Sequence, residues 1–252
     1  MAVFVNDITT KKNAEEELIK NIQKEKELNE MSTQFVSMAS HQFRTPLTVI
    51  KSNMQLLELS NIDHPIISKV STRLNSEVDR LVNLMEDILA MGKVQSGAIK
   101  PHLREVDMID LVKKLKLNIE RSQEDGRILE VNVKGKTKMI NLDTQFMEHA
   151  LNNLIDNAFK YSKGAKNPEI ELKYGKDKLN IRITDFGLGI PKADQSRLFS
   201  SFQRGSNVQH ISGTGLGLAV SKEFISLNGG TIFLDQSRSS NNTTFCIDLP
   251  LN

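Results

Sequence analysis

The feature that most constrains the fold of this chain is the distribution of its glycines. Only Gly92 lies between residues 13 and 95, whereas every other glycine except Gly97 follows residue 125. In the glycine-poor part, apolar residues recur at spacings of three and four, which is the period of an amphipathic helix. The sequence therefore predicts long helices before residue 96 and a mixed α/β domain after it.

Two apolar stripes define the predicted helices. They run through Leu18, Ile22, Leu28, Met31, Phe35 and Met38, and through Val70, Leu74, Val78, Leu81, Leu84, Met85, Ile88 and Leu89. The segment NIDHP at residues 61–65 is typical of a turn, which would join the helices as an antiparallel hairpin. A helix over residues 13–60 would be about 70 Å long, so its stripe needs a partner. A second copy would bury both stripes in a dimeric four-helix bundle. The alternative is a monomeric hairpin packed on the rest of the chain.

Strand and helix patterns alternate in the second part of the chain. Strands are expected at 129–133, 169–174, 179–185, 231–235 and 243–249, and helices at 108–121, 144–161 and 216–227. The link around Asp177 predicts a hairpin between the second and third of these strands. Residues 187–217 lack strong periodicity, and so long a connection indicates a functional loop.

Charge and composition exclude several classes of protein. The formal net charge is only +2, so nothing favours a nucleic-acid partner. A lone Cys246 can form neither an internal disulfide nor a cysteine-built zinc site. No apolar run approaches the roughly 18 residues of a membrane span, and the N-terminus lacks the pattern of a signal peptide. We therefore expect a cytoplasmic location and no membrane contact from this chain.

Two glycine clusters, at residues 187–189 and 213–217, lie at the edges of predicted elements. Glycine lets the backbone approach a ligand closely, and free N–H groups at a helix start favour phosphate oxygens. Neither cluster has the spacing of a Walker loop or of a dinucleotide fingerprint. Taken singly, each is more often a tight turn or a helix cap.

The predicted helix at 144–161 has an unusually polar face. Asn153, Asp156, Asn157 and Lys160 share it at spacings of three and four residues. An amide oxygen can ligate Mg²⁺, and a lysine can meet phosphate charge. The alternative interpretation is a solvated helix face.

Four motifs in order carry a resemblance to a known family. They are NLIDNAFKY at 153–161, DFGLGI at 185–190, FSSFQR at 199–204 and GTGLGL at 213–218. Together they closely resemble the N, G1, F and G2 boxes of the histidine-kinase ATP-binding domain. The resemblance implies a Bergerat-type α/β sandwich that binds ATP with Mg²⁺.

The same resemblance implies roles for individual residues. Asn157 would hold Mg²⁺, Asp185 would accept a hydrogen bond from the adenine amino group, and Arg204 would meet the γ-phosphate. Residues 204–212 would form a mobile lid. The remaining nucleotide contacts would come from Asn153, Lys160, Tyr161, Gly187, Gly189, Ile190, Phe199, Phe202, Gly213, Thr214, Gly215, Leu216 and Gly217. Of these, Gly187 and Gly189 would admit the base, and Phe199 and Phe202 would anchor the lid.

The segment SHQFRTPL at residues 40–47 resembles the phosphoacceptor box of dimeric sensor histidine kinases. The resemblance implies that His41 attacks the γ-phosphate and then passes the phosphoryl group to an aspartate of a response regulator. Gln42 stands where the family most often has a carboxylate that acts as general base. An amide cannot take the proton, so we expect slow autophosphorylation. Thr45 matches the position that orients water when the kinase dephosphorylates its regulator.

The ends of the chain predict a fragment of a longer sensor kinase. Residues 3–18 resemble the last strand of a PAS sensor domain and the helix that leaves it, and we expect no receiver domain after residue 250. The expected organisation is a PAS remnant at 1–12, a signalling helix at 13–30, a dimerisation and phosphotransfer hairpin at 31–95 and an ATP-binding domain at 96–252. Two alternatives stay open: a kinase-weakened, nucleotide-gated scaffold, and a conformational ATPase of the chaperone or topoisomerase type.

Overall fold

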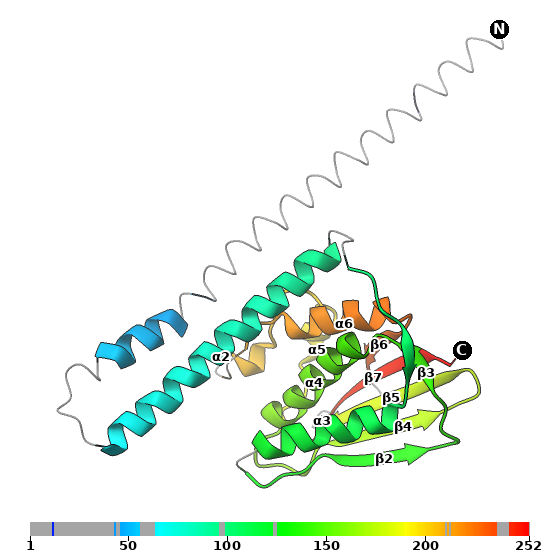
Figure 1. Ribbon diagram of the computed structural model, residues 1–252, viewed down its shortest axis with the longest axis horizontal. Coiled ribbons are helices and arrows are strands. Elements are labelled where there is room, and N and C mark those ends of the chain that lie inside the picture. The colour runs from blue at the N-terminus through cyan, green and yellow to red at the C-terminus, as the bar shows by residue number, and fades with distance from the viewer. Residues whose placement is uncertain are drawn as a thin grey trace. The chain divides into compact units, whose positions relative to one another are not determined.

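Figure 1 shows a computed structural model of the chain, which describes residues 12, 43, 46–55, 64–95, 99–122, 125–209, 211, 213–235 and 242–251. The chain divides into two compact units, Met1–Val82 and Asn83–Asn252. No helix in the described ranges combines the length and the apolar character needed to cross a membrane.

The described part of the first unit is helical. Residues 46–55 form one helical segment, and helix α2, His64–Gln95, begins in this unit and continues into the second. His64 and Pro65 therefore belong to α2, although the sequence placed them in the turn. Proline is well suited to the first turn of a helix, where its missing N–H removes no hydrogen bond.

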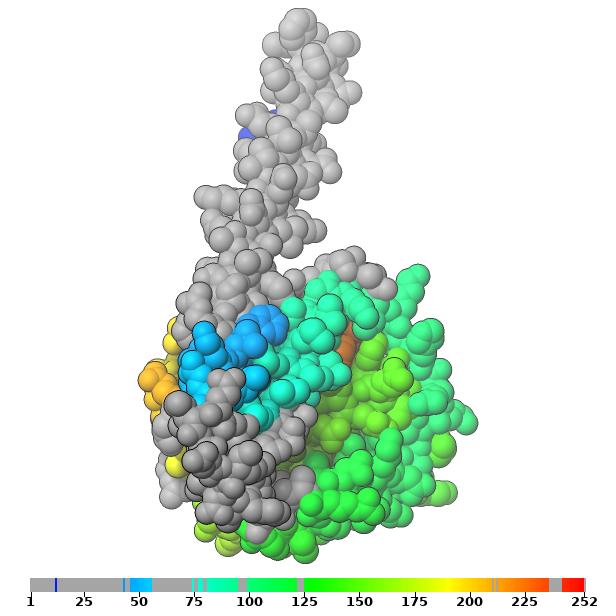
Figure 2. All heavy atoms as spheres, turned by 60° about the vertical axis from the view of Figure 1, so that its left-hand side comes forward, coloured from blue at the N-terminus to red at the C-terminus, as the bar shows by residue number. Residues whose placement is uncertain are grey.

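Helix α2 keeps an apolar stripe exposed to solvent. Val78, Val82, Met85 and Leu89 recur at helical spacing and are 43–53% exposed. The blue-green part of α2 lies on the face shown in Figure 2. Large apolar side chains repeated along one helix face are typical of a surface that contacts another chain.

The second unit is built on a five-stranded sheet in the order β2-β4-β5-β7-β6. The strands are β2 Glu130–Lys134, β4 Glu169–Tyr174, β5 Lys178–Asp185, β6 Thr231–Leu234 and β7 Thr243–Pro250. Only β2 and β4 pair in parallel, and the other neighbours are antiparallel. The predicted hairpin at Asp177 joins β4 to β5, where the N–H of Gly175 donates to the Lys178 carbonyl at 2.9 Å.

Three helices cover one face of this sheet (Figure 1), namely α3 Met108–Ser122, α4 Thr144–Tyr161 and α6 Gly217–Leu227. Helix α4 contacts β5, and α6 contacts β6. Ile170, Leu172 and Tyr174 alternate along β4 and are buried beneath the helices. The second unit is therefore an α/β sandwich, as the family resemblance implied.

Four short elements were not predicted. Strands β1, Arg104–Val106, and β3, Ile140–Leu142, pair as a separate two-stranded antiparallel sheet. Helix α5, Lys192–Gln195, and a 3₁₀ turn, Ser206–Val208, lie inside the segment that was expected to be a loop. Three- and four-residue elements are too short to show a period in the sequence.

The last turns of α2 pack with the sandwich. Met91 is 6% exposed and belongs to its apolar core. His149 Nε2 on α4 lies 3.5 Å from Asp87 Oδ1, and the His149 ring meets the Phe224 ring of α6 edge-on at 5.2 Å. Burial, with the nearby charge of Glu86, raises the pKa of Asp87 to about 6. The expected domain boundary at residue 95 stays a prediction. Judged by packing, the second compact unit begins earlier, at Asn83 inside α2.

Candidate nucleotide site

Helix α4 carries the polar face that the sequence singled out. Asp143 caps its start by accepting the N–H of Phe146 at 3.1 Å, although the sequence analysis did not identify this cap. The Asn153 amide nitrogen donates to Ser221 Oγ on α6 at 2.8 Å. The Asn157 amide nitrogen donates to Asn153 Oδ1 at 3.4 Å. Both asparagines are therefore held by side-chain contacts rather than left in solvent.

Gly217 lets α6 approach this face. A β-carbon built on Gly217 would lie 2.3 Å from Asn153 Oδ1 and 2.7 Å from Asn153 Cγ. Any larger residue would displace the Asn153 side chain. The glycine-rich start of α6 and the polar face of α4 thus form one surface.

Three polar groups converge beside Gly213. A β-carbon built on Gly213 would lie 3.3 Å from Lys160 Nζ, 3.7 Å from the Tyr161 hydroxyl and 3.9 Å from Arg204 Nε. Lys160 Nζ also lies over the Tyr161 ring at 5.4 Å, and burial raises the pKa of Tyr161. Arg204 Nε is buried, and the described residues offer it no hydrogen-bond acceptor. Two cations and a hydroxyl around a glycine fit phosphate oxygens, which would supply that acceptor.

The donor set also fits a hard cation. Asn157 contacts Asn153 through its amide nitrogen, so this bond does not use the Asn157 oxygen. Mg²⁺ prefers oxygen ligands and usually keeps waters and substrate phosphates in its shell. A side-chain oxygen on the same helix as Lys160 is consistent with that preference.

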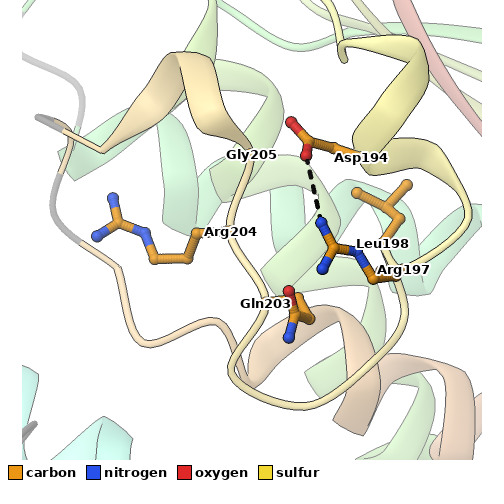
Figure 3. Close-up of a pocket in the computed structure, with 6 residues that line it drawn as sticks. All are labelled: Asp194, Arg197, Leu198, Gln203, Arg204 and Gly205. Atoms are coloured by element: carbon orange, nitrogen blue, oxygen red, sulfur yellow. Dashed lines mark ion pairs between the residues drawn. The ribbon is translucent and has the colours of Figure 1, made fainter.

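A second nitrogen of the Arg204 guanidinium is bound to its own loop. Its Nη2 donates to the carbonyl of Val208 at 2.7 Å and also to that of Ile211. Figure 3 shows the Arg204 side chain extending away from Asp194 and Arg197, whose carboxylate and guanidinium lie 4.0 Å apart at a small hollow. Of the expected lid at 204–212, residues 210 and 212 lie outside the described ranges.

The lid is tied to its surroundings by two further contacts. Asp194 Oδ2 accepts the N–H and the hydroxyl of Ser206 at 2.8 and 2.9 Å, and these bonds lower the Asp194 pKa. The Asn207 amide donates to the Gly189 carbonyl at 3.1 Å. Ser206 and Asn207 therefore contact Asp194 and Gly189, which both follow β5 in the sequence.

Asp185 ends β5 as a buried carboxylate, 5% exposed. Its Oδ1 accepts the N–H of Gly187 at 3.0 Å. Burial raises the Asp185 pKa to about 6, while the bonds from Gly187 and the Thr243 side chain act in the opposite direction. A buried carboxylate that is ionised at neutral pH only accepts hydrogen bonds, so it is suited to recognise a donor such as an exocyclic amine.

The structure gives Gly187 a packing role at the end of α4. A β-carbon there would lie 2.1 Å from the Tyr161 carbonyl oxygen and 2.7 Å from Ser162 Cα. The next amide, that of Leu188, donates to the same Tyr161 oxygen at 3.2 Å. Gly187 is thus required by contact between two protein segments, whereas the sequence suggested only that it admits a base.

The other residues expected at the nucleotide divide between backbone and core roles. Gly189 and Gly215 have φ of 66° and 74°, which favour glycine, and the Gly215 carbonyl accepts the Phe202 N–H at 2.8 Å. Phe202 itself has a φ of 62°, rare for a bulky residue. The Thr214 hydroxyl accepts the N–H of Leu216, and Leu216 is fully buried. The Phe199 ring meets the Phe245 ring edge-on, and Ile190 packs against the core. Because Leu216 is fully buried, its expected contact with a nucleotide stays a prediction.

Two family models match the chain. The His Kinase A phospho-acceptor domain matches residues 31–97, and the histidine kinase-, DNA gyrase B- and HSP90-like ATPase matches residues 142–252. The signal transduction histidine-protein kinase ArlS of Staphylococcus epidermidis is 30% identical over 223 residues, which are 86% of this chain and 48% of ArlS. The sensor protein kinase WalK of Staphylococcus aureus is 28% identical over 238 residues, 92% of this chain and 57% of WalK.

This chain belongs to the histidine kinase family. It spans about half the length of the curated relatives it matches. Among solved structures, the histidine kinase AdeS of Acinetobacter baumannii has a TM-score of 0.66 and 26% identity, covering 84% of this chain and 98% of that one. The family resemblance of the four boxes and the predicted sandwich are therefore confirmed, while the PAS remnant stays a prediction.

The region that matches the phospho-acceptor domain is only partly described. His41, Gln42 and Thr45 lie outside the described residues, whereas Phe43 and Pro46 are helical. Their roles stay predictions. Within the ATP-binding domain, sequence reasoning missed Ser221 as the partner of Asn153. Its position four residues after Gly217, on the same helix face, was an available signal.

Substitution of Gly217 by alanine is expected to weaken nucleotide binding about tenfold while lowering stability little. The added methyl meets the end of a flexible side chain, so Asn153 can swing away, but it then loses its bond to Ser221. Titration calorimetry with ADP and Mg²⁺, combined with thermal melting, would measure both effects. An unchanged affinity would show that the position of Asn153 does not matter for binding.

Proposed function

We propose that this chain is the catalytic core of a sensor histidine kinase that transfers the γ-phosphoryl group of ATP to His41. The observation that carries the proposal is the convergence of Lys160, Tyr161 and Arg204 beside Gly213. Asp185 is linked to this cluster through the two residues that follow Phe186. Gly187 donates its N–H to Asp185 and packs against the Tyr161 carbonyl, and Leu188 donates its N–H to that carbonyl. The site therefore offers cations for phosphates and an acceptor for a base.

The chemistry assigned to these residues is a phosphoryl transfer that depends mainly on positioning and charge neutralisation. Asp185 accepts a hydrogen bond from the adenine amino group, and Lys160 and Arg204 offset the phosphate charge. Asn157 would hold Mg²⁺, which neutralises charge on the phosphates when bound. A nitrogen of the neutral His41 imidazole forms the new N–P bond as the bond from the γ-phosphorus to the ADP oxygen breaks. The imidazole proton passes to solvent or to the phosphate, because Gln42 cannot take it.

The partners follow from the same proposal. The phosphoryl group would pass from His41 to an aspartate of a response-regulator receiver domain, and Thr45 would orient the water that hydrolyses the phosphoaspartate of that regulator to aspartate and free phosphate. The exposed stripe of Val78, Val82, Met85 and Leu89 on α2 supports a homodimer. Sedimentation equilibrium is expected to give twice the mass of one chain, whereas a monomeric mass would support the hairpin packed on its own domain.

Labelling with ATP carrying ³²P at the γ-phosphate tests the kinase proposal. The wild type is expected to take up acid-labile, alkali-stable label that is lost in His41→Ala and in Asn157→Ala. His102→Ala, which removes an exposed histidine of the second unit, serves as the matched control and should keep the label. Free phosphate without a phosphoprotein would favour a conformational ATPase. Nucleotide binding without label would favour the kinase-weakened scaffold that Gln42 suggests.

The substitution Gln42→Glu is expected to raise the single-turnover rate of autophosphorylation by about tenfold or more, since a carboxylate supplies the missing general base. Quenched-flow labelling at several pH values measures this rate. Gln55→Glu introduces the same charge on an exposed position of the helical segment at 46–55 and should leave the rate unchanged. A rate in Gln42→Glu equal to that of the wild type would show that proton removal at this position is not limiting.

A further inference from the structure

Arg127, in the connection between α3 and β2, caps the C-terminal end of α4. Its side chain is only 10% exposed. Its Nη2 donates to the Phe159 carbonyl at 2.9 Å, and its Nη1 donates to the carbonyl and the hydroxyl of Ser162, both at 2.9 Å. The last carbonyls of a helix have no donor within the helix. The guanidinium supplies these donors and places a positive charge at the negative end of the helix dipole.

The guanidinium is itself fixed in orientation. Its Nε donates to Asp125 Oδ2 at 2.6 Å, while the backbone N–H of Arg127 donates to Asp125 Oδ1 at 3.2 Å. Its plane lies over the Phe159 ring at 5.2 Å. All three guanidinium nitrogens thus have a defined acceptor. A lysine ammonium offers no comparable planar fork.

The residues that Arg127 contacts flank two members of the cluster formed by Lys160, Tyr161 and Arg204 beside Gly213. Phe159 and Ser162 lie on either side of Lys160 and Tyr161, whose polar ends approach Gly213. On another side of the same turn, the Tyr161 carbonyl accepts the amide of Leu188, and Gly187 packs against it. The final turn of α4 is therefore held both by Arg127 and by the segment that begins at Asp185.

We propose that Arg127 is a positioning residue for nucleotide binding, which holds the last turn of α4 so that Lys160 and Tyr161 face the phosphates and Leu188 stays bonded to Tyr161. Arg127 lies outside all four nucleotide motifs and acts through the main chain of α4. The inference rests on the proposed nucleotide site. It adds a residue from a different part of the sequence to that site.

The test compares Arg127→Lys with Arg182→Lys. Arg182 lies on the central strand β5, where it pairs with Asp235 and is 26% exposed, so its replacement by lysine is a matched change at a residue that does not contact the end of α4. Hydrogen–deuterium exchange of the Leu188 amide in nucleotide-free protein reports directly on the end of α4. Calorimetric titration with ADP and Mg²⁺ measures the affinity for the nucleotide, which depends on the cluster of Lys160, Tyr161 and Arg204. It is carried out well below the melting temperature of each variant.

In Arg127→Lys the Leu188 amide is expected to exchange about tenfold faster, and the affinity for ADP to fall about tenfold. Arg182→Lys should match the wild type in both measurements. A lower melting temperature with unchanged exchange and affinity would show that Arg127 is only structural and would overturn the inference. If Arg127→Lys fails to fold, Asp125→Asn serves instead, because it weakens the bonds that orient the Arg127 guanidinium and keeps Arg127 itself. It is expected to weaken ADP binding about threefold, and unchanged binding in it would overturn the inference.

The two proposals fail in different ways. Wild-type protein that binds no ADP would overturn the nucleotide site and, with it, the role of Arg127 toward a ligand. Wild-type binding with equal affinity in Arg127→Lys would overturn the inference about Arg127 alone. The exchange rate of Leu188 decides in either case whether Arg127 holds the end of α4.

Discussion

Asp185→Asn is expected to make the protein more stable and to weaken its affinity for ADP by about 100-fold. The two effects have opposite signs because the same carboxylate is unfavourable to folding and necessary for recognition. Asp185 is 5% exposed at the end of β5, and its pKa is raised from 3.8 to about 6. Above that pH the folded protein must bury a negative charge.

The stability effect has a defined pH dependence. The folded state holds the Asp185 proton more tightly than the unfolded state, so stability is highest below the unfolded pKa of 3.8 and falls as the pH rises to about 6. The ionised carboxylate then costs about 3 kcal/mol. Asparagine removes this cost, and we expect a gain of about 1–3 kcal/mol at neutral pH that disappears below pH 4. Urea unfolding at several pH values measures it.

A second carboxylate provides a control of opposite sign. The Lys178 ammonium and the Asn180 amide donate to Asp248, and these bonds lower its pKa. Asp248→Asn should therefore lose stability at neutral pH, and the loss should vanish as the pH falls through the native pKa. A stability gain in both variants would show that the effect at Asp185 does not come from its buried charge.

The loss of affinity follows from donor and acceptor chemistry. Gly187 already donates its N–H to Asp185 Oδ1, and asparagine can keep that bond through its oxygen. Its NH₂ group would then meet the adenine amino group, donor against donor. Such a mismatch, with a buried group left unpaired, is worth about 1–3 kcal/mol, which matches the expected loss. Calorimetry with ADP measures it, and an affinity equal to that of the wild type would show that Asp185 does not contact the base.

Gly187→Ala is expected to destabilise the fold by about 3 kcal/mol. The added β-carbon would lie 2.1 Å from the Tyr161 carbonyl oxygen and 2.7 Å from Ser162 Cα. Both are backbone atoms, so no side chain can move aside, and the end of α4 must shift from the segment after β5. Thermal or urea unfolding measures the loss of stability, and the affinity for ADP should fall with it because Lys160 and Tyr161 lie on the displaced turn.

Gly92→Ala is the control for this substitution. Gly92 lies in α2, and a β-carbon there would meet no atom within 4 Å. Replacing a helical glycine by alanine in open space should stabilise the protein by up to about 1 kcal/mol. If Gly187→Ala were as stable as the wild type, the close contact between Gly187 and Tyr161 would not exist in solution.

Elements with a local signal could be predicted from the amino-acid sequence alone. Helix α4 was predicted at its observed bounds, Thr144–Tyr161, because its apolar residues keep the helical period to the end. Strand β4 was predicted as observed, since Ile170, Leu172 and Tyr174 alternate with polar residues. The ordered motifs likewise identified the family and most residues of the candidate site.

Features that depend on contacts between distant segments could be seen only in the folded chain. Strands β1 and β3 have three residues each and exist because they pair with one another. Arg127 meets Ser162 across 35 positions, and Asn153 meets Ser221 across 68. The need for glycine at 187 arises from the end of another helix. A local pattern reports which face of an element is apolar, but a side chain's partner is set by where the other elements pack, and that is a property of the whole fold.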